Sequence, residues 1–178
     1  MEDAKSMKLT TKIAFLVAGL ALAACTNPNR FGADGAGGAG GAGGNGAFVA
    51  GSATDPTSTA YFNQTVGDRV LFAVDQSTIS DDGRVTLEGQ AQWLLANTDF
   101  TAVIEGHADE QGTREYNVAL GARRANAVRE YLVSRGVAGN RLQTVSFGKE
   151  RPIEICSNEA CYAKNRRAVT VLAGGLSG

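Results

Sequence analysis

Hydrophobic and polar positions follow two different periods between residues 66 and 174, and each period predicts its own kind of element. Four runs rich in β-branched and other apolar residues predict strands, at residues 68–74, 100–107, 140–148 and 167–174. Three further segments predict two long helices and a short helix or turn, at residues 77–98, 114–135 and 158–166. Ser80 is the expected N-cap of the first helix because acidic residues follow it directly, and Gly136 is expected to end the second helix.

Both long helices carry one apolar face. In the first helix the apolar residues recur at i, i+4, i+7 and i+8, namely Leu87, Ala91, Leu94 and Leu95. In the second they step by four, three, three and four residues, namely Val118, Ala122, Ala125, Val128 and Leu132. Strands that alternate with such helices predict an α/β domain, an α+β sandwich whose helices pack on one mixed four-stranded sheet.

Residues 1–24 predict an export signal peptide. Lys8 and Lys12 precede an apolar run that ends in small residues, and this run is shorter than the roughly 20 apolar residues that span a bilayer. Met1 and Met7 are both candidates for the translation start.

The motif Leu22-Ala23-Ala24-Cys25 resembles the lipobox of bacterial lipoproteins. The resemblance implies cleavage before Cys25 and a lipid on that cysteine, whereas the alternative is an ordinary signal peptide followed by a chance cysteine. Two or more acyl chains anchor a protein stably to a membrane. Thr26 stands where an aspartate would retain an enteric lipoprotein in the inner membrane, so the resemblance favours the outer membrane, with the folded domain in the periplasm.

Residues 25–65 are predicted to form the lipidated N-terminus and a flexible linker. The stretch GADGAGGAGGAGGNGAF consists mostly of Gly and Ala and offers little apolar surface to bury. The folded domain is therefore predicted over residues 66–174. The whole chain has 17 basic and 18 acidic residues, a net charge of −1, which argues against nucleic acid as its partner.

His107 is the only histidine of the chain and follows the second predicted strand. A hydrolase of the Ser-His-Asp or Cys-His type would need it beside a nucleophile and an orienting acid such as Asp109. The simpler interpretation is a strand-end histidine that is hydrogen-bonded in a loop. A zinc site would require three or four ligands and hence both downstream cysteines, so we predict neither an enzyme nor a bound metal or other cofactor.

The loop after the second strand and the second long helix predict a binding pocket. Asn117 and Arg124 are seven residues apart and point in nearly the same direction, about a quarter turn from the centre of the apolar face. Asp109 follows the strand end, and Gly112 lets the loop turn back towards the helix. Two interpretations stay open: Asp109 and Arg124 form a structural salt bridge, or they bind a ligand that carries both an ammonium and a carboxylate.

Cys156 and Cys161 remain as a pair once Cys25 takes lipid. Export places them in an oxidising compartment, so a local disulfide is the expected state, and two free thiols are the alternative. The loop that this disulfide closes is short, so its entropic contribution to stability is expected to be modest.

Three stretches carry a family resemblance: EGHADEQGTREYNVALGARRANAVREYL, TVSFGKERP and YAKNRRAVTV. From about Val70 to Leu172 the chain resembles the OmpA-like peptidoglycan-binding domain, and in particular the peptidoglycan-associated lipoproteins. This implies an OmpA-like fold that binds the diaminopimelate of the peptidoglycan stem peptide, whose free end is a zwitterion. The implied contacts to this ligand are Asp109, Arg124, Asn117, Leu120, Thr113, Phe72 and Asn165, with Arg166 nearby.

Some of these assignments stay open. Phe72 and Arg166 could equally be core packing and a solvated charge. Gln111 departs from the arginine that is frequent in the family at this position, which removes one positive charge near the ligand. The cysteine pair and the Gly-rich linker are also departures.

The resemblance further implies a place in the Tol-Pal system, with TolB and TolA as partners at cell division. The alternatives are a general OmpA-like lipoprotein without Tol partners, and a cell-wall hydrolase that uses His107.

Overall fold

The computed structural model describes residues 49–155 and 157–174. The predicted signal peptide, the predicted lipidation site Cys25, most of the predicted linker and Cys156 lie outside the described residues. The fold below is that of the described part.

Four strands form one sheet in the order β1-β4-β2-β3. Their bounds are Arg69–Leu71 for β1, Phe100–His107 for β2, Leu142–Gly148 for β3 and Arg167–Gly174 for β4. Strand β4 runs antiparallel to both β1 and β2, whereas β2 and β3 are parallel. This arrangement confirms the predicted mixed sheet, although β1 is shorter than the sequence pattern suggested.

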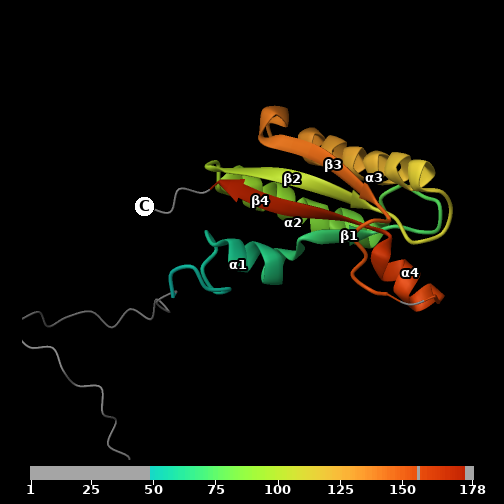
Figure 1. Cartoon of the computed structure of the whole chain (residues 1–178). Coiled ribbons are helices and arrows are strands. Elements are labelled where there is room, and N and C mark those ends of the chain that lie inside the picture. Colours follow the sequence, from blue (N-terminus) through green and yellow to red (C-terminus); the bar gives the residue numbers. More distant parts are fainter. Residues whose placement is uncertain (1–48, 156, 175–178) are drawn as a thin grey trace, which may run out of the picture. The chain divides into compact units, whose positions relative to one another are not determined.

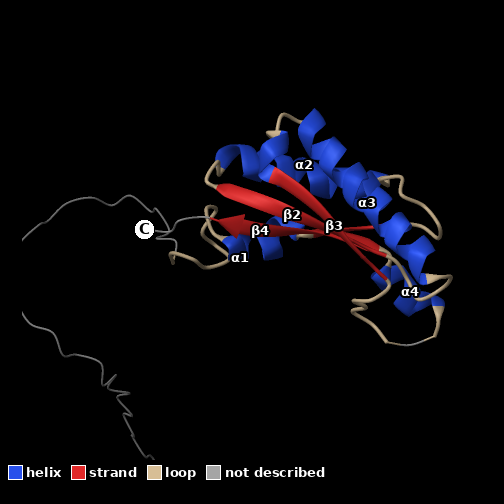
Figure 2. Ribbon diagram, turned by 45° about the horizontal axis from the view of Figure 1, so that its top comes forward, coloured by secondary structure: helices blue, strands red, loops and turns tan. Residues whose placement is uncertain are grey.

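Two long helices lie together on one face of the sheet, as Figure 1 and Figure 2 show. Helix α2 spans Asp81–Ala96 and helix α3 spans Arg114–Ser134. The Ser80 side chain accepts a hydrogen bond from the Gly83 amide, as an N-cap should. The shorter helices are α1 at Thr59–Tyr61, a π-helical turn at Phe62–Gly67, a 3₁₀ turn at Gly139–Arg141 and α4 at Glu159–Asn165.

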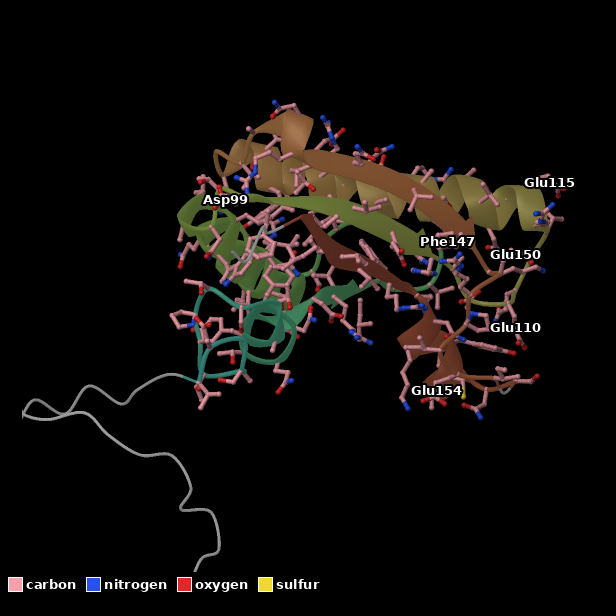
Figure 3. The ribbon with its side chains drawn as sticks, turned by 60° about the vertical axis from the view of Figure 1, so that its left-hand side comes forward. Asp99, Glu110, Glu115, Phe147, Glu150 and Glu154 are labelled. Carbon is pink, nitrogen blue, oxygen red and sulfur yellow. The ribbon has the colours of Figure 1, made fainter. Side chains whose placement is uncertain are left out.

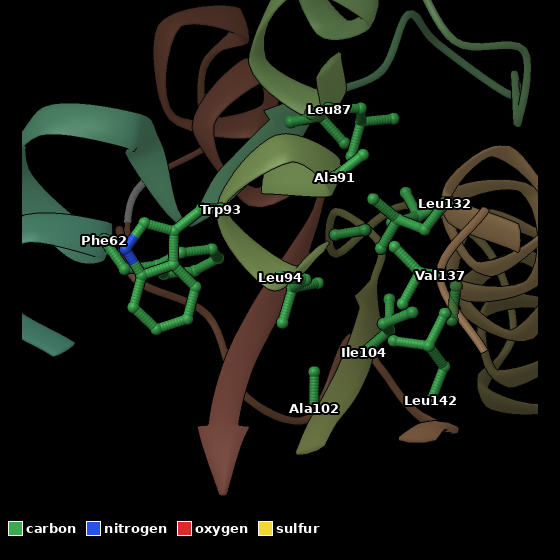
Figure 4. Packing of buried hydrophobic residues seen from close by; sticks show 14 of the residues in the cluster. Phe62, Leu87, Ala91, Trp93, Leu94, Ala102, Ile104, Leu132, Val137 and Leu142 are labelled. Carbon is green, nitrogen blue, oxygen red and sulfur yellow. The ribbon is translucent and has the colours of Figure 1, made fainter. Parts of the chain in front are cut away.

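The core lies between this helical layer and the sheet (Figure 4). From α2 it receives Leu87, Ala91 and Leu94, as predicted, and also Trp93. Leu95 was assigned to the same face, but its side chain is 45% exposed. Trp93 instead packs beneath the chain that precedes β1, because that segment covers this side of α2.

The buried face of α3 includes the predicted Ala125, Val128 and Leu132, but its N-terminal half is rotated from the predicted position. Val118 is 39% exposed, whereas Leu120, Gly121 and Arg124 are buried. The cause is a close backbone approach: a Cβ on Gly106 of β2 would lie 1.8 Å from the carbonyl oxygen of Gly121. Since only glycine fits there, the helix presses on the strand at Gly121, and its polar residues on that side become buried.

The folded domain begins earlier than residue 66, where the sequence predicted its boundary. Phe62 is fully buried, with its ring 4.9 Å from that of Trp93. The Trp93 indole also donates a hydrogen bond of 2.8 Å to the carbonyl of Pro56. The linker prediction was wrong for this stretch because a single buried aromatic residue among polar neighbours produces no periodic pattern.

No helix within residues 49–155 and 157–174 is long and apolar enough to cross a membrane.

Candidate functional site

A pocket of about 300 Å³ opens where the β1–α2 loop, the β2–α3 loop and the first turns of α3 meet. Three of the predicted site residues line it: Asp109, Asn117 and Leu120. The remaining lining residues are Val74, Asp75, Gln111, Gly112 and Tyr116. The pocket therefore combines two carboxylates with amide and hydroxyl groups on a partly apolar wall.

Hydrogen bonds between the β2–α3 loop and α3 shape this pocket. Asn117 is 1% exposed, and its side-chain amide donates to the Gln111 carbonyl over 2.7 Å. The Gln111 amide in turn donates to Asp109 Oδ1 over 3.2 Å. Thr113 lies outside the lining and acts as the N-cap of α3, accepting from the Tyr116 amide. The loop is thus organised before any ligand arrives.

Arg124 is completely buried directly behind the pocket. Its guanidinium donates to three backbone carbonyls: those of Gln76 at 2.8 Å, His107 at 2.8 Å and Ala73 at 3.2 Å. These bonds join the β1–α2 loop to the end of β2. Burial lowers the pKa of Arg124 to about 10, against the opposing attraction of Asp109, so the group stays charged at neutral pH. Phe72 lies in the core with its ring 5.2 Å from this guanidinium, outside the pocket lining.

Asp109 forms its ion pair with Arg166, at 3.2 Å between Oδ2 and Nη1. The salt bridge between Asp109 and Arg124, which the sequence left open, is therefore not the one that forms. Arg166 is 4% exposed and also contacts Glu159 and the Phe72 carbonyl. Burial opposes its charge, but the hydrogen bonds to Glu159 and Asp109 outweigh burial and raise the pKa of Arg166.

Asn165 supports the site from a distance. Its side chain accepts from the Ile153 amide at 2.9 Å and donates to the Glu154 carbonyl at 2.8 Å. It therefore fixes the loop that precedes α4 and does not line the pocket.

His107 is 1% exposed at the end of β2, with its ring stacked 5.6 Å from that of Phe147. Within the described part of the chain neither ring nitrogen forms a hydrogen bond, so the predicted loop hydrogen bond is absent. Glu105 Oε2 lies 3.5 Å from Nε2, too far for a hydrogen bond to a neutral imidazole. Burial, then Arg167 and Arg151, lower the pKa of His107 to about 4, so the ring is neutral at neutral pH.

Asp75 and Tyr116 are pocket residues that the sequence analysis missed. The Tyr116 hydroxyl donates to the Asp75 carboxylate, which raises the pKa of the tyrosine. Asp75 adopts a φ of 57°, unusual for a residue other than glycine. Its position directly after the first predicted strand was the available signal, since side chains at strand ends gather at one edge of a sheet.

The wall of the pocket is rich in hydrogen-bond acceptors, and a buried cation lies behind it. The carboxylates of Asp75 and Asp109 can accept from an ammonium group, and the buried guanidinium of Arg124 adds positive charge near both of them. Among residues 49–155 and 157–174, no three His, Cys, Asp or Glu side chains lie close enough to hold a metal ion. Cys161 is disulfide-bonded, while its expected partner Cys156 lies outside the described residues.

A family model matches most of the described domain. Residues 71–166 match the model of the OmpA family. The chain is 51% identical over 162 residues to a peptidoglycan-associated lipoprotein of Rhizobium meliloti, covering 91% of this chain and 87% of that protein. It is 39% identical over 159 residues to the peptidoglycan-associated lipoprotein of Haemophilus influenzae, covering 86% of this chain and 93% of that protein.

Solved structures resemble the same domain. The crystal structure of the peptidoglycan-associated lipoprotein from Burkholderia pseudomallei superposes with a TM-score of 0.62 at 36% identity, covering 67% of this chain and all of that one. The C-terminal domain of Helicobacter pylori MotB gives a TM-score of 0.57 at 22% identity, over 61% of this chain and 86% of that one, a likeness of fold alone.

Proposed function

The chain belongs to the OmpA family and, within it, to the peptidoglycan-associated lipoproteins, and from this premise we propose that it binds peptidoglycan non-covalently through the diaminopimelate of the stem peptide. Its role is that of an anchor between the outer membrane and the cell wall. The observation that carries the proposal is the pocket lined by Asp75 and Asp109 with Arg124 behind it.

The free end of diaminopimelate carries an ammonium and a carboxylate, and the pocket offers a partner for each. Asp109 lines the pocket and pairs with Arg166 through Oδ2, whereas its Oδ1 accepts from the Gln111 amide and has a further lone pair for an ammonium. Arg124 has five N–H donors, of which three contact backbone carbonyls. The ligand carboxylate binds the guanidinium by taking the place of a carbonyl in the 73–76 loop. Leu120 and Asn117 supply the apolar and amide walls.

The proposed anchor needs a lipid at Cys25 and a periplasmic domain that binds the cell wall. Cys25 carries acyl chains, including palmitate, in the outer membrane, and the Gly-rich segment after it spans the distance to the periplasmic domain. TolB, and through it or directly TolA, is the proposed protein partner during envelope constriction at cell division.

A peptidoglycan pull-down tests the binding site. The soluble chain from Thr26 onwards is expected to sediment with purified peptidoglycan, and free diaminopimelate is expected to compete. Asp109→Ala and Arg124→Ala should each abolish sedimentation. Arg123→Ala is the matched control, because Arg123 is an exposed neighbour of Arg124 on the same helix. If both pocket variants bind as well as the parent chain, the pocket assignment is wrong.

The Tol partnership needs its own experiment. Capture of TolB by the soluble chain supports a place in the Tol-Pal system, whereas peptidoglycan binding without TolB capture favours a general OmpA-like lipoprotein. Peptidoglycan turnover that His107→Ala removes would point instead to a hydrolase.

A further inference from the structure

Residues between Lys149 and Arg166 form hydrogen bonds and an ion pair with the loop that carries Asp109. Lys149 Nζ donates to the carbonyls of Glu110 at 3.3 Å and Gly112 at 2.7 Å. Arg166 pairs with Asp109 at 3.2 Å. The pocket loop is therefore bonded at several residues to a segment that does not line the pocket.

Besides Asp109, Glu110 is a residue of the loop whose side chain takes part in these contacts. Its Oε1 accepts hydrogen bonds from Ser157 Oγ at 3.1 Å and from the Tyr162 hydroxyl at 3.0 Å. Figure 3 shows Glu110 at the same end of the domain as Glu150 and Glu154, away from Asp99. The hydrogen bond to Glu110 raises the pKa of Tyr162, so its hydroxyl keeps the proton that it donates.

The direction of the Glu110 side chain shows whether it can contact a ligand or only hold the loop. Glu110 does not line the pocket, although its neighbours Asp109 and Gln111 both do. Because its carboxylate faces α4 and not the pocket, it is placed to hold the loop and not to touch a ligand.

The surface that receives Glu110 is itself well fixed. The side chain of Asn158 caps α4 by accepting from the Cys161 amide, and Cys161 is disulfide-bonded. At the other end of α4, Arg166 donates to the Phe72 carbonyl at 3.1 Å. A loop bonded to such a helix loses less conformational entropy when a ligand arrives.

We propose that Glu110 is a positioning residue, which Ser157 and Tyr162 hold so that Asp109 and Gln111 face the pocket. The proposal rests on the function proposed for that pocket. Removing the Glu110 contact leaves the loop less ordered, and the ligand must then order it on binding. A hydrogen bond of this kind contributes about 1 kcal/mol, so a variant that lacks it should bind about fivefold more weakly.

The experiment uses the soluble chain from Thr26 onwards. It measures the dissociation constant of this chain for peptidoglycan, and the concentration of free diaminopimelate that displaces the chain from peptidoglycan. Glu110→Ala and Tyr162→Phe should each weaken binding about three- to tenfold. Glu110→Gln should bind like the parent chain, since an amide oxygen also accepts from both hydroxyls. The double variant Glu110→Ala with Tyr162→Phe should be no weaker than Glu110→Ala alone, because the two side chains share one contact.

Glu154→Gln is the matched control. Glu154 lies at the same end of the domain, and its side chain pairs with Lys164 and not with the loop. This variant should bind like the parent chain, and Glu110→Ala and Tyr162→Phe should still unfold cooperatively in urea with the parent's dependence on urea, which shows that the domain remains folded. Two results overturn the proposal: unchanged binding by Glu110→Ala, or equal weakening by Glu110→Gln and Glu110→Ala with normal binding by Tyr162→Phe. The second result would mean that Glu110 acts through its charge.

Hydrogen exchange separates this proposal from the proposed function. Without any ligand, Glu110→Ala and Tyr162→Phe should speed exchange of the Gln111 amide, which is bonded to Asp109, whereas Glu110→Gln should not. If the parent chain failed to bind peptidoglycan while this exchange pattern held, the function would be wrong and the positioning role of Glu110 would stand. An unchanged exchange rate in both variants would overturn the positioning role itself.

Discussion

Replacing Arg124 by lysine tests whether the buried guanidinium holds the pocket together. Three different nitrogens of Arg124 contact the carbonyls of Ala73, Gln76 and His107. A lysine keeps the charge but has a single nitrogen, which cannot occupy all three positions. Two carbonyls then lose their hydrogen bond to a charged group, at about 1–3 kcal/mol each, so Arg124→Lys should lower the free energy of unfolding by about 2–6 kcal/mol.

Urea unfolding followed by tryptophan fluorescence measures this loss. Trp93 is the only tryptophan of the chain and is buried in the core, so its emission reports unfolding of the domain. The midpoint should fall while the dependence on urea stays the same, since the surface exposed on unfolding is unchanged. Arg123→Lys is the control and should stay within about 0.5 kcal/mol of the parent chain, because Arg123 is exposed.

Binding supplies the second readout for the same substitution. Arg124→Lys should also lose most of its affinity for peptidoglycan, since the bidentate contact with a carboxylate requires the guanidinium fork. If Arg124→Lys unfolded at the same urea midpoint as the parent, the three carbonyl contacts would not support the loop, and the reasoning would be refuted.

Three further predictions concern the core and the pH response. Phe62→Ala should lower the free energy of unfolding, measured in urea, by about 3–5 kcal/mol. A loss below about 1 kcal/mol would mean that the segment around Phe62 belongs to the linker and not to the folded domain. Gly106→Ala should prevent native folding, because the new Cβ would lie 1.8 Å from the Gly121 carbonyl oxygen; native-like circular dichroism and an unchanged melting temperature would contradict this. Folding lowers the pKa of His107 from 6.5 to about 4, so its contribution to stability is complete above pH 6.5 and is lost as the pH falls towards 4, by about 3 kcal/mol. The His107→Gln variant should lack this part of the pH dependence, and an identical profile would show that another group causes it.

Local patterns were enough to predict most elements. Ser80 caps α2 as expected, and Gly136 follows α3 with a φ of 101°. Apolar periodicity predicted the helices because the energy of each helix depends on its own face. It could not predict Phe62, since burial of a single aromatic residue depends on which distant surface folds over it, here that of Trp93.

The candidate site was likewise predictable only in part. Residue types and order along the chain predicted that Asp109 and Asn117 would lie beside one loop, and the family resemblance added Leu120. The structure places all three in one pocket. The chain alone left open whether Asp109 pairs with Arg124. Only the tertiary structure decided this, because Arg166, 57 residues further along the chain, reaches Asp109 while backbone carbonyls from two other elements surround Arg124.

The sequence by itself thus determined the two-layer architecture and the chemistry available at the loop after β2. Those features follow from local propensity, from periodicity and from residue type. The tertiary structure decided which charges pair, where the domain begins and which side of α3 is buried. Those features depend on contacts between distant residues, such as the approach of Gly121 to Gly106, and such contacts leave no local pattern in the chain.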